Sequence, residues 1–402
     1  MGHTSDAALV REKVDQAIGV LKEEGIDSWI LLGRESDVLG DPSLPFIAGT
    51  SVTWESAFIL TAKGDRVAIV GTADVPNVEG TGAWTEVIGY VKGMSGPFHE
   101  TIERLNPGSI ALNFSPGNYM ADGLTYGMWM NVQGWLAGTP YLDRIVTGED
   151  IVTKVRGRKS PEEIRRIRQA VDTTVEIWEA LTAWLRPGLT EREIQGFMHA
   201  ECERRGLGTS WDRRYCPTVT AGPDSPVGHT LPGEFVTTPG QLLRIDFGVN
   251  QEDYTSDMQR TFYFLRDGEN EAPEAVRGPF AHIDAAIQMA AAAIKPGKKG
   301  WEIDKIARDY FAENDLPTWN YGLGHQMGRA CHDGGVLLGP RWERYGELPN
   351  QVIEANHVYV LETGFSIPEF GLAVIEDDFV VTDDGIEWLA PPQRELILID
   401  GA

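Results

Sequence analysis

Two segments in the second half of the chain share the same landmarks in the same order. WLRPGLTEREI (residues 184–194) and AIKPGKKGWEI (residues 293–303) each place a Pro-Gly pair after a helical run, and Glu-Ile follows at the same offset. Further along, RIDFG (244–248) and VLETG (360–364) each end an apolar run with a carboxylate and a glycine. Three matched landmarks predict a duplicated unit of two helices and a sheet, in which the two carboxylates hold equivalent places.

Each half of this predicted repeat places two carboxylates inside apolar strands. A turn over residues 250–253 would set Asp246 directly opposite Asp257, and a turn at the Pro-Glu-Phe-Gly segment would pair Glu362 with Glu376. Opposed side chains have Cβ atoms about 5 Å apart. Two carboxylates that close repel, and one stays protonated unless a cation lies between them. A single acid at a strand edge usually faces solvent, but two equivalent pairs predict a cation site.

A glycine-rich segment, GLGHQMGRACHDGG at residues 322–335, adds imidazoles to this prediction. A lone histidine is more often a satisfied core or surface residue than a ligand. Here, however, His325 would complete a site of four carboxylates, which suits two divalent ions that share bridging carboxylates. Oxygen donors with one imidazole favour manganese, cobalt or zinc over copper(I) or an iron–sulfur cluster. Such a pair of ions generates a hydroxide near neutral pH and stabilises a tetrahedral intermediate.

The length of the chain predicts two domains. At 402 residues it is too long for one ordinary core. Residues 1–155 alternate helix-like and strand-like segments, which predicts an α/β domain. Ser160, with Glu163 three residues later, forms the start signal of a new helix, so the second domain is expected at residues 156–402.

Charge and cysteine usage exclude several classes of partner. A formal net charge of -25 argues against a nucleic-acid or anionic-lipid partner. The uncharged run at residues 123–142 contains asparagine, glutamine, glycine and proline, so it is interpreted as core and not as a membrane span. Three cysteines without paired spacing are typical of free thiols in a reducing compartment. We therefore expect a cytoplasmic protein that acts on a small peptide or another small molecule.

With these residues described, the sequence resembles the M24 metallopeptidase family, the pita-bread fold of methionine aminopeptidase, Xaa-Pro aminopeptidase, prolidase and creatinase. The segments DFG, SDMQRT, GHQMGRACH, LETG and VIEDD follow the family's order and spacing, and the similarity spans nearly the whole chain. The resemblance implies an α/β architecture with a creatinase-like or prolidase-like N-terminal domain at residues 1–155. It further implies a pita-bread catalytic domain with internal duplication at residues 156–402, and a homodimer.

The resemblance also assigns roles to individual residues. The implied ligands of two divalent metal ions are Asp246, Asp257, His325, Glu362 and Glu376. Glu362 would double as the proton shuttle for the activated water. His229 would contact the substrate near the scissile bond, His332 would steady the tetrahedral intermediate, and Thr261 would support the ligands.

Several positions depart from the pattern of Xaa-Pro-cleaving relatives. Val374 stands where those relatives usually have an arginine, and Thr363 replaces the commoner proline. Asp377 and Asp378 are expected to be solvated acids at a strand end. Candidate substrate-binding residues, with arginines for a carboxylate and rings for an apolar or cationic group, are Trp211, Arg213, Arg214, Tyr215, Trp319 and Tyr321.

Three functions remain open on this scaffold. The first is a dinuclear metallohydrolase with Xaa-Pro peptides as default substrate, and hydrolysis of another amide, or creatinase-like amidinohydrolysis, is a variant of it. The second is a lyase similar to the dimethylsulfoniopropionate-cleaving members of the fold, which the altered pocket allows. The third is a metal-free protein-binding module, against which the retained ligand set argues.

Overall fold

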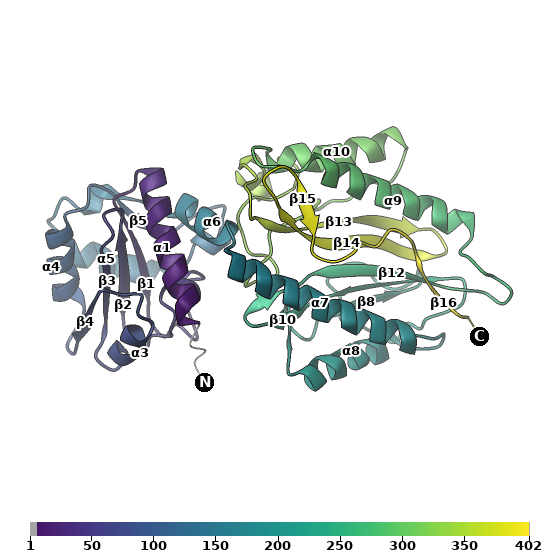
Figure 1. Ribbon diagram of the computed structural model, residues 1–402, viewed down its shortest axis with the longest axis horizontal. Coiled ribbons are helices and arrows are strands. Elements are labelled where there is room, and N and C mark those ends of the chain that lie inside the picture. Colours follow the sequence, from purple (N-terminus) through teal and green to yellow (C-terminus); the bar gives the residue numbers. More distant parts are fainter. Residues whose placement is uncertain (1–5, 402) are drawn as a thin grey trace. The chain divides into compact units, whose positions relative to one another are not determined.

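The computed structural model of the protein describes residues 6–401. The chain divides into two compact units, the first ending at Arg156 and the second beginning at Gly157 (Figure 1). None of the helices within residues 6–401 is long and apolar enough to cross a membrane. All three cysteines are free thiols.

The first unit is built on a six-stranded sheet in the order β4-β3-β2-β1-β5-β6. The pairs β1–β2 and β2–β3 are antiparallel, and the other neighbouring pairs are parallel. The strands are β1 (Ser28–Gly33), β2 (Ser56–Thr61), β3 (Arg66–Gly71), β4 (Glu86–Tyr90), β5 (Ile110–Leu112) and β6 (Ile145–Thr147). The mixed α/β character expected for this half is therefore present.

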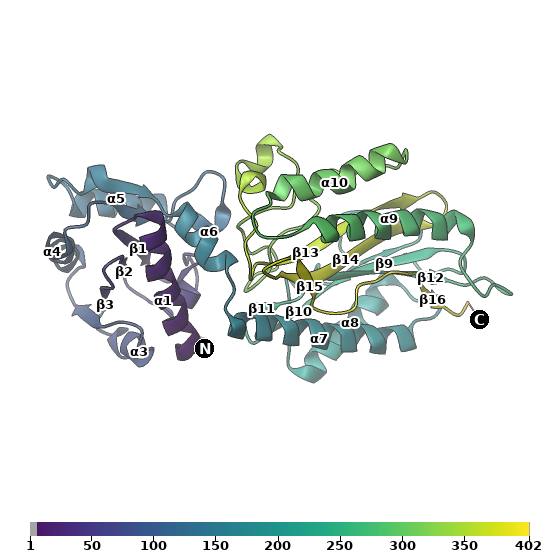
Figure 2. The ribbon, with the colours of Figure 1, turned by 45° about the horizontal axis from the view of Figure 1, so that its top comes forward.

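Helices cover both faces of this sheet (Figures 1 and 2). Side chains alternate along β1, so Trp29 and Leu31 share a core with α1, whereas Ile30 and Leu32 share a core with α4 and α5. The α-helices are α1 (Ala7–Glu24), α2 (Leu44–Ile47), α3 (Val75–Gly80), α4 (Ser95–Leu105), α5 (Tyr126–Trp135) and α6 (Glu149–Gly157). Two 3-10 turns, η1 (Tyr119–Ala121) and η2 (Leu142–Arg144), complete the unit.

The second unit contains the predicted pair of helical repeats. Gly188 and Gly297, the glycines of the two Pro-Gly turns, have φ angles of 85° and 91°, which glycine adopts without strain. Ser160 caps the first helix, and Glu163 closes the capping box. The helices are α7 (Pro161–Trp184), α8 (Glu191–Arg205), α9 (Glu274–Ala293) and α10 (Gly300–Glu313), with the 3-10 turns η3 (Glu343–Tyr345) and η4 (Leu348–Asn350).

The main sheet of this unit has the strand order β13-β14-β12-β9-β8, with β15 added beside β14 and β16 beside β12. Its strands are β8 (Thr218–Ala221), β9 (Leu242–Phe247), β12 (Met258–Phe264), β13 (Val358–Ile367), β14 (Gly371–Val381), β15 (Ile386–Trp388) and β16 (Ile397–Ile399). A small sheet in the order β11-β10-β7 combines β7 (Gly208–Thr209), β10 (Val249–Gln251) and β11 (Tyr254–Thr255).

Two helix pairs cover the main sheet, with α9 and α10 on one side of the strands in the view of Figure 2 and α7 and α8 on the other. Trp178 of α7 contacts the rings of Phe247 and Phe262, and Leu361 and Ile375 share a core with α9 and α10. Because successive side chains of a strand point to opposite faces, the acids next to these residues point away from the helices.

The hairpin registers confirm one prediction and correct another. Glu362 pairs with Glu376 as expected. Asp246, in contrast, pairs with Gln259 and not with Asp257. The turn lies on Glu252 and Asp253, both with positive φ, one residue later than predicted. The register is therefore displaced by two residues. A displacement by two keeps every side chain on its predicted face, so Asp257 lies diagonal to Asp246.

Candidate metal centre

Four adjacent strands place polar side chains in one row on the helix-free face of the main sheet. Along this row β13 contributes Glu362, β14 Glu376, β12 Gln259 and β9 Asp246. The row follows from hydrogen-bonded register alone, because directly paired residues point to the same side of a sheet. The duplication therefore supplies three of the four predicted carboxylates from equivalent hairpins.

Asp257, the residue directly before β12, belongs to the same cluster. It is 4% exposed, and its backbone N–H donates to Asp378 Oδ2 at 3.2 Å. Asp378 is 1% exposed, and so is Asp377, which pairs with Arg260 at 2.7 Å. The expectation that Asp377 and Asp378 are solvated is wrong, because both are buried within a central strand, where Asp377 contacts Arg260 and Asp378 accepts from the backbone of Asp257.

His325 brings an imidazole nitrogen to two of these carboxylates. Its Nε2 lies 3.6 Å from Asp257 Oδ2 and 4.0 Å from Glu376 Oε1. Its Nδ1 lies 3.3 Å from the carbonyl oxygen of Gln326, which can only accept, so Nδ1 carries the proton and Nε2 presents a lone pair. The three ligand atoms lie within 4.8 Å of one another, which is the separation of donors around one metal ion.

Three buried carboxylate oxygens in the cluster have no hydrogen-bond partner within residues 6–401. They are Asp246 Oδ1, Asp257 Oδ1 and Glu376 Oε2. An unpaired buried carboxylate oxygen is costly. Asp257 and Glu376 each direct one oxygen towards His325 and leave the other without a partner, as bridging carboxylates would. The donor set therefore fits divalent cations on an observation independent of the sequence motif.

The acid–base properties of the cluster reflect its burial. Burial, and then the charge of Asp246, raises the pKa of Asp257 well above its usual range. Burial, and then the charge of Asp257, does the same to the pKa of Glu376, and burial, followed by Asp246, raises the pKa of Glu362 to about 8. Burial, and then His332, holds the pKa of His325 well below its usual value. The cluster thus resists holding its full negative charge without a cation.

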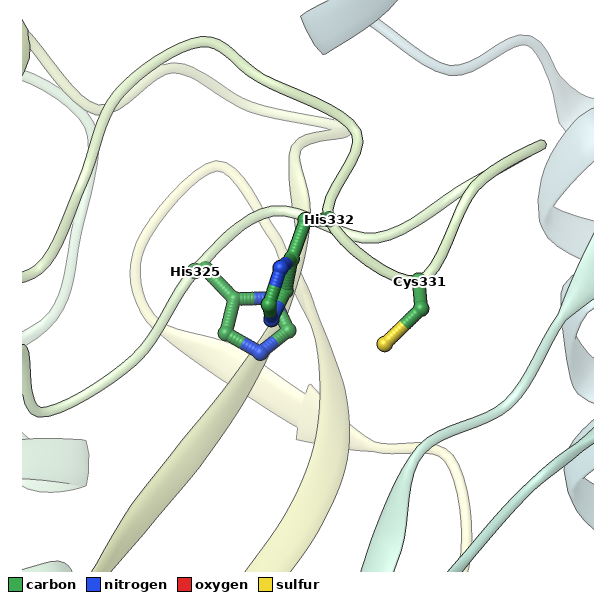
Figure 3. A group of neighbouring side chains, drawn as sticks. All are labelled: His325, Cys331 and His332. Carbon is green, nitrogen blue, oxygen red and sulfur yellow. The ribbon is translucent and has the colours of Figure 1, made fainter. Parts of the chain in front are cut away.

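Cys331 and His332 lie beside His325 on the glycine-rich segment (Figure 3). The rings of His325 and His332 meet edge to face with centroids 4.3 Å apart. The Cys331 thiol donates to Asp257 Oδ2 at 2.9 Å, and burial, followed by Asp257, raises the pKa of this thiol. His229 lies on an exposed loop, and after burial its charge is the next cause that lowers the pKa of His332. His332 therefore lies beside the cluster, and His229 acts on His332 through its charge.

Two further residues of the site escaped the sequence interpretation. Arg244, two residues before Asp246 and on the same face, donates to Asp246 Oδ2 at 2.8 Å and to Gln259 Oε1 at 2.6 Å. Gln259 in turn donates to Glu362 Oε2 at 3.2 Å. The sequence alone could have indicated Arg244, because residues two apart in a strand point to the same face. A basic residue at that spacing marks a partner for the carboxylate.

An ion pair inside the protein anchors the glycine-rich segment. Lys159 Nζ lies 2.8 Å from Asp333 Oδ2, and the two side chains are 1% and 4% exposed. Asp333 also accepts from the backbone N–H of Ala330 at 3.3 Å. Asp333 directly follows His332, so this pair fixes the backbone that carries His332. Thr261, expected to support the ligands, bonds through its hydroxyl to the backbone of Val374.

The candidate pocket residues are in different surroundings. Arg213 pairs with Glu203, and Arg214 pairs with Asp212, all on exposed side chains. Trp319 is 5% exposed and belongs to the core with Phe311. Trp211 and Tyr215 are half-buried. Among these candidates, Tyr321 is the one whose pKa is changed by the charges of the cluster. After burial, the charge of Glu362 is the largest cause that raises the pKa of Tyr321.

Comparison with known proteins agrees with this geometry. The sequence pattern of metallopeptidase family M24 matches residues 165–383. An uncharacterised peptidase of Staphylococcus aureus is 26% identical over 337 residues, covering 83% of this chain and 87% of that protein. An uncharacterised peptidase of Bacillus subtilis is 24% identical over 277 residues, covering 69% and 73%.

Solved structures share the fold. An Xaa-Pro dipeptidase from Bacillus anthracis superposes with a TM-score of 0.75 at 22% identity, covering 97% of this chain and 100% of that chain. An X-Pro aminopeptidase from Thermotoga maritima gives a TM-score of 0.72 at 20% identity, covering 96% and 99%. The expected pita-bread architecture is thereby confirmed, and fold and site together define a metal-dependent peptidase. The chain belongs to metallopeptidase family M24.

Proposed function

We propose that this peptidase is a dinuclear enzyme that cleaves Xaa-Pro peptides, as an aminopeptidase or a dipeptidase. The observation that carries the proposal is the set of three unpartnered buried oxygens on Asp246, Asp257 and Glu376 beside the lone pair of His325 Nε2. Solved structures of the same fold described as Xaa-Pro dipeptidase and X-Pro aminopeptidase support the choice of substrate.

The ligands divide naturally between two divalent ions. Asp257, His325, Glu362 and Glu376 would hold one ion, and Asp246, Asp257 and Glu376 would hold the other. Manganese, cobalt or zinc suits this mixture of carboxylates and one imidazole. Bound ions would supply an activated water as nucleophile and would polarise the scissile carbonyl.

The protein's own residues provide the proton transfers and the hydrogen bonds. Gln259 fixes one oxygen of Glu362, so its carboxylate is oriented to take a proton from the attacking water and pass it to the leaving amine. His332 donates a hydrogen bond to the developing oxyanion from beside His325. His229 approaches the substrate from its loop near the scissile bond. Burial of Asp257 and Glu376 excludes bulk water from the metal side of the site.

A substrate panel tests the proposal. Chain reconstituted with manganese, cobalt or zinc is given Xaa-Pro dipeptides, longer Xaa-Pro peptides, non-proline amides and dimethylsulfoniopropionate. We expect hydrolysis of Xaa-Pro bonds by wild type, loss in Asp257→Ala and no change in Asp383→Asn, which alters an exposed acid after β14. Activity in Asp257→Ala equal to that of wild type, or dimethyl sulfide release without peptide cleavage, would overturn it. No observation favours the lyase.

We also propose a cytoplasmic homodimer. The support is the resemblance of the N-terminal half to that of dimeric relatives, together with the absence of disulfides from the chain. Sedimentation velocity at micromolar concentration tests the dimer, and a single species with the 44.3 kDa mass of one chain would contradict it.

A further inference from the structure

Three donors of a different chemistry from the carboxylates meet beside the metal cluster. The thiol of Cys331 and imidazole nitrogens of His325 and His332 all lie within 4.8 Å of one another. Figure 3 shows the sulfur of Cys331 on the side of its backbone that faces the two imidazoles. Cys331 and His325 are half-buried and His332 is exposed, so a dissolved ion can reach this group from solvent.

The local chain geometry holds these donors together. His332 directly follows Cys331, and the buried ion pair of Asp333 anchors the backbone immediately after them. The thiol donates to Asp257 Oδ2 at 2.9 Å, and His325 Nε2 lies 3.6 Å from the same oxygen. The sulfur and the lone pair of His325 therefore border one space, and an ion placed there would contact both.

A thiol with two imidazoles selects a softer ion than carboxylates do. Thiolate and imidazole ligands suit zinc and its cobalt analogue, whereas manganese prefers oxygen donors. In a tetrahedral zinc site such donors lie about 3.5 Å apart. Small rotations of the thiol and of the exposed imidazole would complete this geometry, and water would fill the fourth position. The thiol loses its proton to solvent when the ion binds.

This thiol-containing set cannot be filled together with the full carboxylate site, because both need His325. The Nδ1 of His325 carries the proton, so Nε2 holds the lone pair of the ring, and one lone pair binds one ion. An ion bound to the sulfur also ends the hydrogen bond that the thiol gives to Asp257. Occupancy of the thiol-containing set therefore removes a ligand from the carboxylate-bound ion.

We propose that His325, Cys331 and His332 form an alternative site that captures zinc and takes His325 away from the carboxylate-bound ion. The capture of zinc goes beyond the proposed function and does not depend on it. The consequence for catalysis rests on the proposed function: excess zinc should inhibit the manganese-loaded peptidase, because the ion that activates water loses its imidazole ligand.

Cobalt(II), a spectroscopic probe for zinc sites, tests the capture directly. Added in excess to the metal-free full chain, it should give wild type the near-ultraviolet absorption of a cobalt–thiolate bond. Cys331→Ser, whose hydroxyl can still donate to Asp257, should lack this absorption, and His332→Ala should need at least about 10-fold more cobalt to reach it. Cys202→Ala, which alters a buried thiol on α8, is the matched control and should behave as wild type. Wild type without the absorption, or Cys331→Ser with it, would overturn the proposal.

Inhibition by zinc tests the competition for His325. Each protein is loaded with manganese, and hydrolysis of an Xaa-Pro dipeptide is followed as zinc is added, relative to the activity of the same protein without zinc. We expect Cys331→Ser to require at least about 10-fold more zinc than wild type for half inhibition. Equal sensitivity of the two proteins would overturn the competition. If no manganese-loaded protein cleaves the dipeptide, the proposed function fails, and the cobalt absorption still decides whether the site exists.

Discussion

Replacing Glu362 with glutamine should stabilise the metal-free protein at neutral pH while it weakens metal binding. Burial and Asp246 raise the pKa of Glu362 from 4.5 to about 8. The folded protein therefore binds more protons at this site than the unfolded chain between these two values, so stability falls as pH rises through that window. A neutral glutamine of the same shape keeps the contact with Gln259 and carries no such penalty.

The magnitude follows from the two pKa values. At pH 7 the ionisation of Glu362 stabilises the unfolded chain by about 3 kcal/mol, whereas Glu362 in the folded protein stays protonated and gains nothing comparable. Part of the side chain is accessible to solvent, so we expect Glu362→Gln to raise the free energy of unfolding by about 2 kcal/mol at pH 7. At pH 5 the gain should fall below about 1 kcal/mol, because pH 5 lies only about half a unit above the pKa of Glu362 in the unfolded chain.

Urea denaturation of chelator-treated protein at several values between pH 5 and pH 8 measures this difference. Glu313→Gln, at an exposed position in α10, serves as the matched control and should follow wild type. Added manganese should reverse the order, stabilising wild type more than Glu362→Gln, and this gain should grow with pH. Parallel pH curves for wild type and Glu362→Gln, with no gain at pH 7, would refute the reasoning.

Three more substitutions test individual interactions. Lys159→Met should cost about 3–5 kcal/mol, because it removes the buried ammonium that pairs with the Asp333 carboxylate; denaturation measures this, and recovery is expected when Asp333→Asn is added. Trp178→Ala should cost about 3–5 kcal/mol, since its ring, 5% exposed, fills the space beside two phenylalanines, and a loss below 1 kcal/mol would contradict the packing. Cys331→Ala should tighten manganese binding about fivefold in calorimetry, because the ion no longer displaces the thiol from Asp257; weaker binding would show that the sulfur assists the ion.

The repeat and the strand alternation allowed most of the catalytic unit to be predicted. Pro-Gly turns and capping boxes act locally, so the positions of the helices followed from short segments. The pairing of Glu362 with Glu376 could be predicted because the turn between them is centred midway between the two residues. The other hairpin was displaced by two residues, because Glu252 and Asp253 adopt positive φ, which a sequence of ordinary acidic residues does not indicate. A displacement by two residues does not change the face to which a side chain points, so the carboxylates still lie on the same face of the sheet.

What escaped prediction depends on contacts distant in sequence. Asp377 and Asp378 were predicted to be solvated acids at a strand end. They are buried instead, because Asp377 pairs with Arg260 and Asp378 accepts from the backbone of Asp257, both more than a hundred residues earlier in the chain. Arg213 and Arg214 were predicted to bind an anion, but each forms an ion pair with an acidic residue at the surface. The arginine in the cluster is instead Arg244, whose importance emerges only from its place beside Asp246.

Metal content tests the central claim most directly. Purified chain is dialysed to equilibrium against micromolar manganese or cobalt, and the bound metal is measured by mass spectrometry together with protein concentration. The account predicts two ions per chain for wild type and fewer than one for Asp257→Asn, since both ions share Asp257. Wild-type protein that binds no ion, or Asp257→Asn protein that binds as many as wild type, would contradict it.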